Sequence, residues 1–337
     1  MRNFKKIILP GLCVILILAV VNTFMNYALI PYSYVRIMMH QAATEEYDTV
    51  FLGTSHGLNG ISPKIVERET GRSCINLCLG GEYPRDSYYL LRKVCEKSIP
   101  KRVVYELDAG YWCTEEGQRG DFNRIYYEMP WSSAKLEYFA AKMLELDFRA
   151  ALFPWFYYRG QFKEIKETIA CKQSQDYKEY GSQAFQKPHQ GFVDGFIKNN
   201  TAPSDKPEEE IELWNEKQKN LDSFRYFEKL VSFCRKHNVE LVVITTPVPQ
   251  ETLEKHQKEY QQMNAYFSAY MRERGIPYWN YNLPEYKMDD FDYSLRIFSD
   301  YEGHMNGDQA EIFSLRLSKD LNRGSYEVEE IHNRDDN

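Results

Sequence analysis

Residues 49–60, TVFLGTSHGLNG, decide how the rest of the chain is interpreted. The stretch begins with apolar and β-branched residues, as does a short strand that is buried on both faces. It then breaks at Gly53, and a glycine after a strand permits a sharp turn. Ser55 lies on this turn, at what would be the carboxyl edge of a parallel sheet, where open α/β sheets bind ligands. Ser55 is therefore a candidate nucleophile.

The composition is that of a globular protein. Of the 337 residues, 43% are hydrophobic and 27% are charged, which is too apolar for a disordered chain. The net charge of −7 argues against binding to nucleic acid, which requires a basic surface. No grouping of cysteines and histidines has the spacing of a zinc site, and we expect neither a metal nor a cofactor.

The N-terminus contains a long apolar segment. Residues 7–30 carry no charge, and Arg2, Lys5 and Lys6 precede them. About 20 helical residues cross the roughly 30 Å hydrocarbon core of a bilayer. The positive-inside rule then predicts a cytoplasmic N-terminus and a plasma membrane protein whose remaining chain is extracellular. A cleaved signal peptide is the alternative, but no small-x-small cleavage site follows the segment.

Strand and helix patterns alternate beyond this segment. After the first strand, apolar runs at residues 74–79, 102–107, 239–245 and 276–281 predict further strands, and helical patterns lie between them. Alternation of this kind predicts βαβ units: an α/β, doubly wound, flavodoxin-like three-layer sandwich with a parallel sheet. We expect residues 1–36 to form a cytoplasmic tip and transmembrane anchor, and residues 45–337 an extracytoplasmic domain.

The alternation stops at about residues 115–206, which hold no clear strand. This stretch is rich in aromatic residues and is predicted to be a helical insertion. The run from Phe153 to Tyr157 could stack on sugars or lie at a membrane interface. It could equally form the core of the insertion.

The cysteines do not define a disulfide framework. Cys74 and Cys78 are expected on one strand, where four residues span about 13 Å, too far for a bridge. Buried free thiols are therefore the expected state of the cysteines outside the apolar segment.

Two residues near the C-terminus could activate Ser55. Asp300 and His304 precede the last predicted helix, and a serine hydroxyl needs a base that is oriented by an acid. The backbone N–H groups after Ser55, or those of Gly80 and Gly81, could hold an oxyanion. The same motif and residue order fit an α/β-hydrolase, but the short stretch between the apolar segment and Ser55 leaves no room for its earlier strands.

These motifs resemble the SGNH/GDSL hydrolase superfamily. Gly53-Thr54-Ser55 is similar to its first block, Gly80 or Gly81 to its oxyanion glycine, and Asp300 with His304 to its last block. With the apolar segment and the insertion, the chain looks most like the membrane-anchored branch that includes teichoic-acid D-alanylation and alginate-type polysaccharide O-acetylation proteins.

The chain also departs from the family pattern. Thr54 replaces the usual aspartate, three residues rather than two separate Asp300 from His304, and Asp108-Ala109-Gly110 stands where the family has glycine-x-asparagine. Asp108 and His56 are therefore further candidates for the oxyanion or binding site. Ser55 and Asp300 could alternatively be helix caps.

The resemblance implies a membrane-anchored extracytoplasmic serine esterase or O-acyltransferase. Such an enzyme would transfer acetyl or D-alanyl groups to or from a cell-surface glycan or teichoic acid. The rival hypotheses are a non-catalytic glycan-binding or assembly protein and a scaffold for a membrane O-acyltransferase partner.

Overall fold

The structure is a computed structural model that describes residues 2–117, 122–201 and 211–335, with side chains for those between 9 and 323. The chain divides into two compact units. One comprises residues 1–37 and 118–184, and the other residues 38–117 and 185–337. We refer to them as the anchor unit and the sheet unit and describe each by itself.

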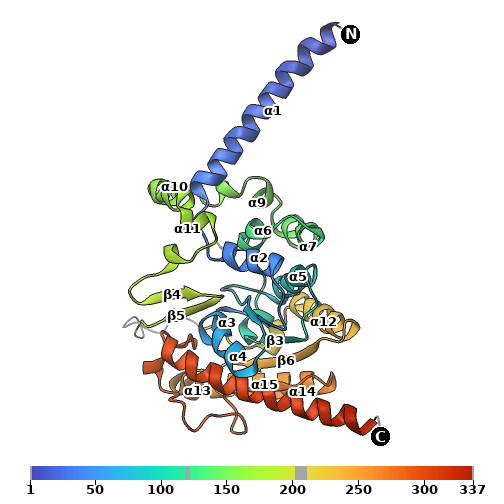
Figure 1. Ribbon diagram of the computed structural model, residues 1–337, viewed down its shortest axis with the longest axis vertical. Coiled ribbons are helices and arrows are strands. Elements are labelled where there is room, and N and C mark those ends of the chain that lie inside the picture. Colours follow the sequence, from blue (N-terminus) through green and yellow to red (C-terminus); the bar gives the residue numbers. More distant parts are fainter. Residues whose placement is uncertain (1, 118–121, 202–210, 336–337) are drawn as a thin grey trace. The chain divides into compact units, whose positions relative to one another are not determined.

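The sheet unit is built on a five-stranded sheet with the order β2-β1-β3-β6-β7. Figure 1 labels β3 and β6 of this sheet. Its strands are β1 (Thr49–Leu52), β2 (Cys74–Asn76), β3 (Arg102–Glu106), β6 (Glu240–Thr245) and β7 (Tyr278–Asn280). Each strand pairs in parallel with its neighbours. This is the strand order of flavodoxin-like doubly wound sheets, in which ligands bind where the order reverses, beside β1 and β3. The predicted α/β fold is therefore confirmed.

The central strands are apolar because both of their faces are covered. Val50, Phe51 and Leu52 of β1 have no exposed surface, and the same holds for Val103 and Val104 of β3. A strand buried on both faces has no polar side to alternate with its apolar side. This explains the continuous apolar runs in the sequence.

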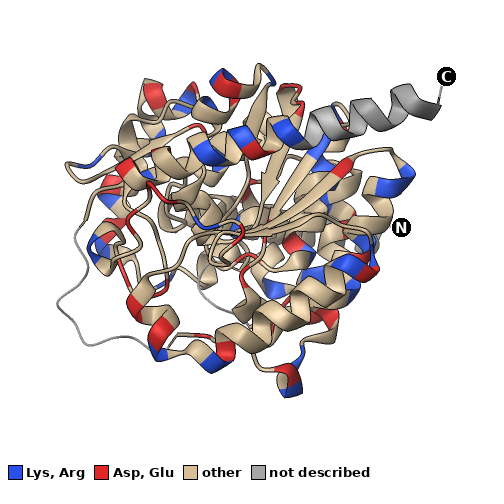
Figure 2. Cartoon of the chain, turned by 90° about the horizontal axis from the view of Figure 1, so that it is seen from below, with Lys and Arg blue, Asp and Glu red and all other residues tan. Residues whose placement is uncertain are grey.

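Two groups of helices cover the sheet. One group consists of α3 (Ser55–Gly60), α4 (Pro63–Thr70) and the long C-terminal α15 (Gly307–Asp335), which packs on both short helices. The other contains α5 (Pro84–Cys95), α12 (Leu221–Lys236) and α14 (Gln257–Glu273), and α13 (Gln250–Lys255) precedes α14. Right-handed crossovers place these two groups on opposite faces. Charged residues of both signs are spread over the helices, whereas the strands are mostly uncharged (Figure 2).

A hairpin in the sheet unit contradicts one prediction from the sequence. β4 (Gln190–Val193) and β5 (Phe196–Asn199) pair antiparallel, so the expectation that residues 115–206 hold no strand is wrong. The turn between them is Asp194-Gly195, and both residues have positive φ, 49° and 81°. A two-residue Asp-Gly loop in this conformation is a preferred hairpin turn.

The second predicted strand is shorter than expected. It ends at Asn76, so Cys78 lies beyond the strand that was predicted to reach residue 79. The Asn76 amide donates to the carbonyl oxygens of Gly57 (3.0 Å) and Ile61 (2.9 Å), and its oxygen accepts from the N–H of Cys78 (2.9 Å). The side chain of Asn76 thus fastens the end of the strand to α3. All seven cysteines are free, four of them buried.

The anchor unit is helical. Its first helix, α1 (Arg2–Leu29), contains the segment Leu9–Leu29, which is long and apolar enough to cross a membrane. The connecting helix α2 (Val35–Thr44) runs on into the sheet unit. The remaining elements are α6 (Arg124–Glu128), α7 (Ser133–Tyr138), the π-helical η2 (Phe139–Met143), α8 (Leu144–Leu146), α9 (Arg149–Leu152), η3 (Pro154–Phe156), η4 (Phe162–Glu164), α10 (Ile165–Gln173) and α11 (Gln175–Lys178).

The aromatic residues of the anchor unit serve two different purposes. Tyr126 and Tyr138 are buried in its core, whereas Phe153 and Phe156 are nearly half exposed. The hypothesis that the run from Phe153 to Tyr157 forms the core of the insertion therefore does not explain Phe153 and Phe156.

Candidate active site

The turn after β1 presents Ser55 at the carboxyl edge of the sheet. Gly53 has φ of +144°, and a Cβ atom there would lie 2.6 Å from both Cβ and the carbonyl oxygen of Glu106 on β3. Only glycine fits a position with this φ and this close neighbour. Thr54 follows, and its hydroxyl oxygen accepts from the N–H of His56 (3.3 Å) and so caps α3. Since Thr54 is the cap, the alternative that Ser55 merely caps the helix is wrong.

Glu106 holds this turn in place. Its Oε2 accepts from the N–H of Thr54 (2.8 Å) and from the Thr54 hydroxyl (2.9 Å). The carboxyl group is buried, and burial raises its pKa although the bonds from Thr54 and the charge of His56 oppose this. Glu106 is not among the site residues predicted from the sequence, although a glutamate inside the apolar run 102–107 indicates a buried carboxyl group near the end of a strand.

Ser55, His304 and Asp300 form a connected chain of hydrogen bonds. Nε2 of His304 lies 2.6 Å from Oγ of Ser55, and Nδ1 lies 2.6 Å from Oδ2 of Asp300. In the tautomer that serves both contacts, Nδ1–H donates to Asp300 and Nε2 accepts from the Ser55 hydroxyl. Burial favours a higher pKa for Asp300, but the hydrogen bonds from His304 and the charges of His304 and His56 together outweigh burial and lower the pKa. The geometry is that of a nucleophile, a base and an orienting acid.

The loop that carries Asp300 and His304 is shaped by Asp300 itself. Its Oδ1 accepts from the N–H groups of Gly303 (3.1 Å) and His304 (3.2 Å). Gly303 has φ of +114°, a conformation that glycine adopts without strain. The three residues between the acid and the base are therefore accommodated by a turn closed at Gly303.

Gly80 and Gly81 lie on the loop after β2. A Cβ atom on Gly80 would lie 3.8 Å from Cβ of Ser55, whereas one on Gly81 would have no neighbour within 4 Å. Gly81 has φ of +76°, and the N–H of Leu79 donates to the carbonyl oxygen of Gly53 (3.0 Å). Gly80 therefore faces Ser55, and Gly81 supplies the turn.

His56 and Asp108 also reach the site. Nδ1 of His56 lies 3.4 Å from Oδ2 of Asp108, and the His56 ring centroid lies 4.7 Å from that of His304. Asp108 follows β3 and caps the short η1 (Ala109–Trp112). The residues selected from the sequence thus gather at this edge of the sheet, where the strand order reverses.

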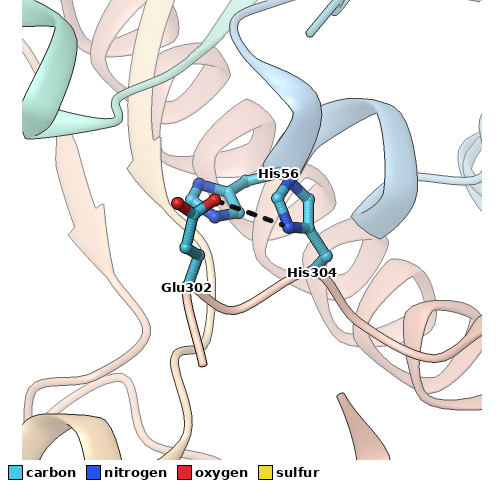
Figure 3. A group of neighbouring side chains, drawn as sticks. All are labelled: His56, Glu302 and His304. Atoms are coloured by element: carbon cyan, nitrogen blue, oxygen red, sulfur yellow. Dashed lines mark ion pairs between the residues drawn. The ribbon is translucent and has the colours of Figure 1, made fainter. Parts of the chain in front are cut away.

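Glu302 adds a third group to the two histidines. His56, Glu302 and His304 each have one side-chain atom that could bind a metal ion, and these three atoms lie within 4.8 Å of one another. Figure 3 shows the three side chains. Oε2 of Glu302 is 3.9 Å from Nδ1 of His304. Zinc accepts two imidazoles and a carboxylate, but the nitrogens of His304 already contact Ser55 and Asp300. An ion that used Nε2 of His304 would replace its bond with Ser55, so we assign the cluster to the imidazole–carboxylate network.

The chain is similar to a solved protein structure. No family model and no curated protein matches the chain. A protein assigned to the lipolytic G-D-S-L family from Desulfitobacterium hafniense DCB-2 has a similar structure, with a TM-score of 0.37 and 10% sequence identity. The match covers 81% of this chain and 98% of that chain.

Proposed function

We propose that the protein is a membrane-anchored extracytoplasmic serine esterase or O-acyltransferase. The observation that supports this best is the unbroken chain of contacts from Ser55 through His304 to Asp300. These residues come from opposite ends of the sheet unit, and the groups have the roles that acyl transfer requires.

The reaction would proceed in two halves. Oγ of Ser55 attacks the ester carbonyl while its proton passes to Nε2 of His304. Asp300 stabilises the imidazolium, which then protonates the departing alcohol and leaves an acyl-Ser55 ester. Water or a sugar hydroxyl next gives its proton to Nε2 of His304 and attacks the acyl carbon. The imidazolium then returns this proton to Oγ of Ser55 as the acyl–Oγ bond breaks, which restores the starting state.

The proposed cellular setting of this reaction is based on α1. An apolar span preceded by Arg2, Lys5 and Lys6 would hold the sheet unit outside the plasma membrane. The acceptors in reach there are cell-surface glycans or teichoic acids, and acetyl or D-alanyl groups are the acyl groups proposed. A membrane O-acyltransferase is the proposed partner that would supply an acyl group.

The test is hydrolysis of p-nitrophenyl acetate by the purified full-length protein in detergent. Wild type should release p-nitrophenol, and Ser55→Ala and His304→Ala should each reduce kcat to near background. Because the members of such a triad act as a unit, the double variant should lose little more than either single one. Turnover that survives in Ser55→Ala would contradict the proposal. A wild-type protein without turnover that still binds cell-wall glycan would favour the binding-protein alternative.

A further inference from the structure

A second imidazole–carboxylate pair lies beside the proposed nucleophile and has no part in the reaction above. Asp108 contacts Nδ1 of His56 at 3.4 Å, and its other oxygen accepts from the N–H of Gly110 (3.0 Å). The carboxylate is thus fixed at the start of η1. It orients the His56 ring as Asp300 orients that of His304.

The other nitrogen of this ring is unsatisfied. Nε2 of His56 is buried and has no hydrogen-bond partner among the described residues. Buried polar atoms in folded proteins are nearly always paired, and an exception requires an explanation. This one belongs to the residue after Ser55 and lies beside the His304 ring, with the Glu302 carboxylate within 4.8 Å of both histidines, so we look for its missing acceptor among the groups that approach Ser55.

The surroundings favour a protonated ring. Burial alone lowers the pKa of His56, but the bond to Asp108 and the charges of Asp108, Glu106 and Asp300 outweigh it and raise the pKa to about 10. A protonated imidazole donates from both nitrogens and has no lone pair with which to accept a proton. His56 can therefore be a donor at neutral pH but not a second base.

We propose that His56, oriented by Asp108, donates from Nε2 to the oxyanion that forms when Ser55 attacks an acyl carbonyl. This rests on the proposed serine esterase function. Gly80 lies against Ser55 on the other loop of the site, and its backbone N–H would be a neutral donor to the same oxygen. A charged donor stabilises the developing negative charge more strongly than a neutral one.

The experiment compares kcat and KM for p-nitrophenyl acetate in five full-length proteins. These are wild type, Ser55→Ala, His56→Ala, His56→Gln and the control His189→Ala, which changes an exposed histidine elsewhere in the sheet unit. His56→Ala should lower kcat by about 10²–10³ with little change in KM, as loss of one oxyanion donor does. His56→Gln should recover part of this loss because its amide also donates. His189→Ala should match wild type.

A fifth variant separates catalysis from folding. Asp108→Asn removes the largest of the charges that raise the pKa of His56, while Glu106, Asp300 and Glu302 remain, so the alkaline fall in kcat should lie at lower pH in this variant than in wild type. A purely structural role would not shift this profile. If kcat of His56→Ala stays within threefold of wild type while Ser55→Ala is inactive, the oxyanion role is overturned and the esterase remains. If no turnover depends on Ser55, both proposals fall. If His56→Ala does not fold, the oxyanion role is tested by the kcat of His56→Gln and by the pH profile of Asp108→Asn.

A separate set of contacts in the anchor unit carries a second inference. Two asparagines interrupt the apolar span of α1, and both are paired with the segment 148–156. The Asn22 amide donates to the carbonyl oxygen of Leu152 (3.1 Å) and its oxygen accepts from Nε1 of Trp155 (2.9 Å). The oxygen of Asn26 accepts from the N–H of Trp155 (3.1 Å). These three hydrogen bonds hold Leu152 and Trp155 against α1.

The position of Asn22 fixes how deep this contact lies. Asn22 precedes Leu29, the last residue of the span, by seven residues, which is about 10 Å along a helix. If the span crosses a bilayer, Leu152 and Trp155 lie within its outer half. Leu152 and Trp155 lie in α9 and η3, and Phe153 between the two helices donates its N–H to the carbonyl oxygen of Arg149 (2.7 Å), as a medium that offers no hydrogen bonds requires.

The exposed surface of this segment is mostly apolar, and its one charged side chain, Arg149, is 65% exposed and paired with Asp147 at 2.8 Å. Phe148, Leu152, Phe153 and Phe156 are exposed by 49%, 52%, 47% and 45%. An exposed cluster of large apolar side chains marks an interaction site, and this one is continuous with the exposed apolar surface of α1. We infer that residues 148–156 insert into the outer leaflet beside α1, with acyl chains as their contact. This rests on the proposed membrane span.

Photocrosslinking in nanodiscs of phosphatidylglycerol and phosphatidylcholine tests the insertion. Benzoylphenylalanine would replace Phe153 or Phe156, with Ile17 of α1 as the positive control and the exposed Leu221 of the sheet unit as the negative control. Mass spectrometry should find lipid adducts at positions 17, 153 and 156 and none at 221. Lipid adducts at position 17 but not at 153 and 156 would overturn the insertion of residues 148–156 and leave the membrane span of α1 intact. Crosslinks from 153 and 156 to protein would do the same. No adduct at 17 would overturn the span as well.

Discussion

At the scale of single residues, the turn that carries Ser55 depends on one glycine. Gly53 combines a φ of +144° with a neighbour that leaves no room for a Cβ atom. Gly53→Ala should therefore lower the free energy of unfolding by roughly 3 kcal/mol or more, because strain and overpacking add. The matched control is Gly71→Ala, which has φ of +67° but open space around it and should cost about 1 kcal/mol. Urea denaturation measures both, and equal losses would contradict the argument.

His56 should make stability depend on pH in a defined direction. Its pKa is about 10 in the folded protein against roughly 6.5 in an unfolded chain, so the folded state binds the proton more tightly. The resulting stabilisation is fully present below about pH 6.5 and is lost as pH rises towards 10. The groups that face the ring are Asp108, Glu106, Asp300, Glu302 and His304. The difference in unfolding free energy between wild type and His56→Gln should shrink from pH 6 to pH 10, and a constant difference would contradict this.

At the scale of elements, α3 is positioned by its cap. Thr54 caps the helix and donates to buried Glu106. Thr54→Ala removes the cap and leaves Glu106 short of a donor, so it should cost about 2 kcal/mol and reduce turnover. Thr54→Ser keeps the hydroxyl and should restore most of both. A serine variant as impaired as the alanine variant would show that the methyl group, not the hydroxyl, matters.

The elements also show what the sequence can predict and what it cannot. The parallel strands were predictable because burial on both faces gives continuous apolar runs, as in β1 and β6. The β4–β5 hairpin was missed although Asp194-Gly195 is a strong turn signal, because an aromatic-rich background hid its short strands. The position of Ser55 followed from Gly53, but no local pattern shows that Glu106 would hold the turn or that Nε2 of His56 would lack a partner. Such contacts depend on how strands distant in sequence are aligned.

At the scale of the whole molecule, the proposed reaction requires a defined topology. The span Leu9–Leu29 follows Arg2, Lys5 and Lys6, and α1 has no charged residue within the span. Basic residues remain on the cytoplasmic side of a membrane, so the C-terminus should lie outside. Alkaline phosphatase fused after Asn337 should therefore be active, and a green fluorescent protein that folds only in the cytoplasm should stay dark at the same position. Both fusions should remain in the membrane fraction at full length.

The opposite reporter pattern would place Ser55 in the cytoplasm, away from any surface glycan. A shortened active phosphatase in the medium would instead identify the apolar segment as a cleaved signal peptide, which would leave the Ser55 site intact but remove the lipid contact proposed for residues 148–156.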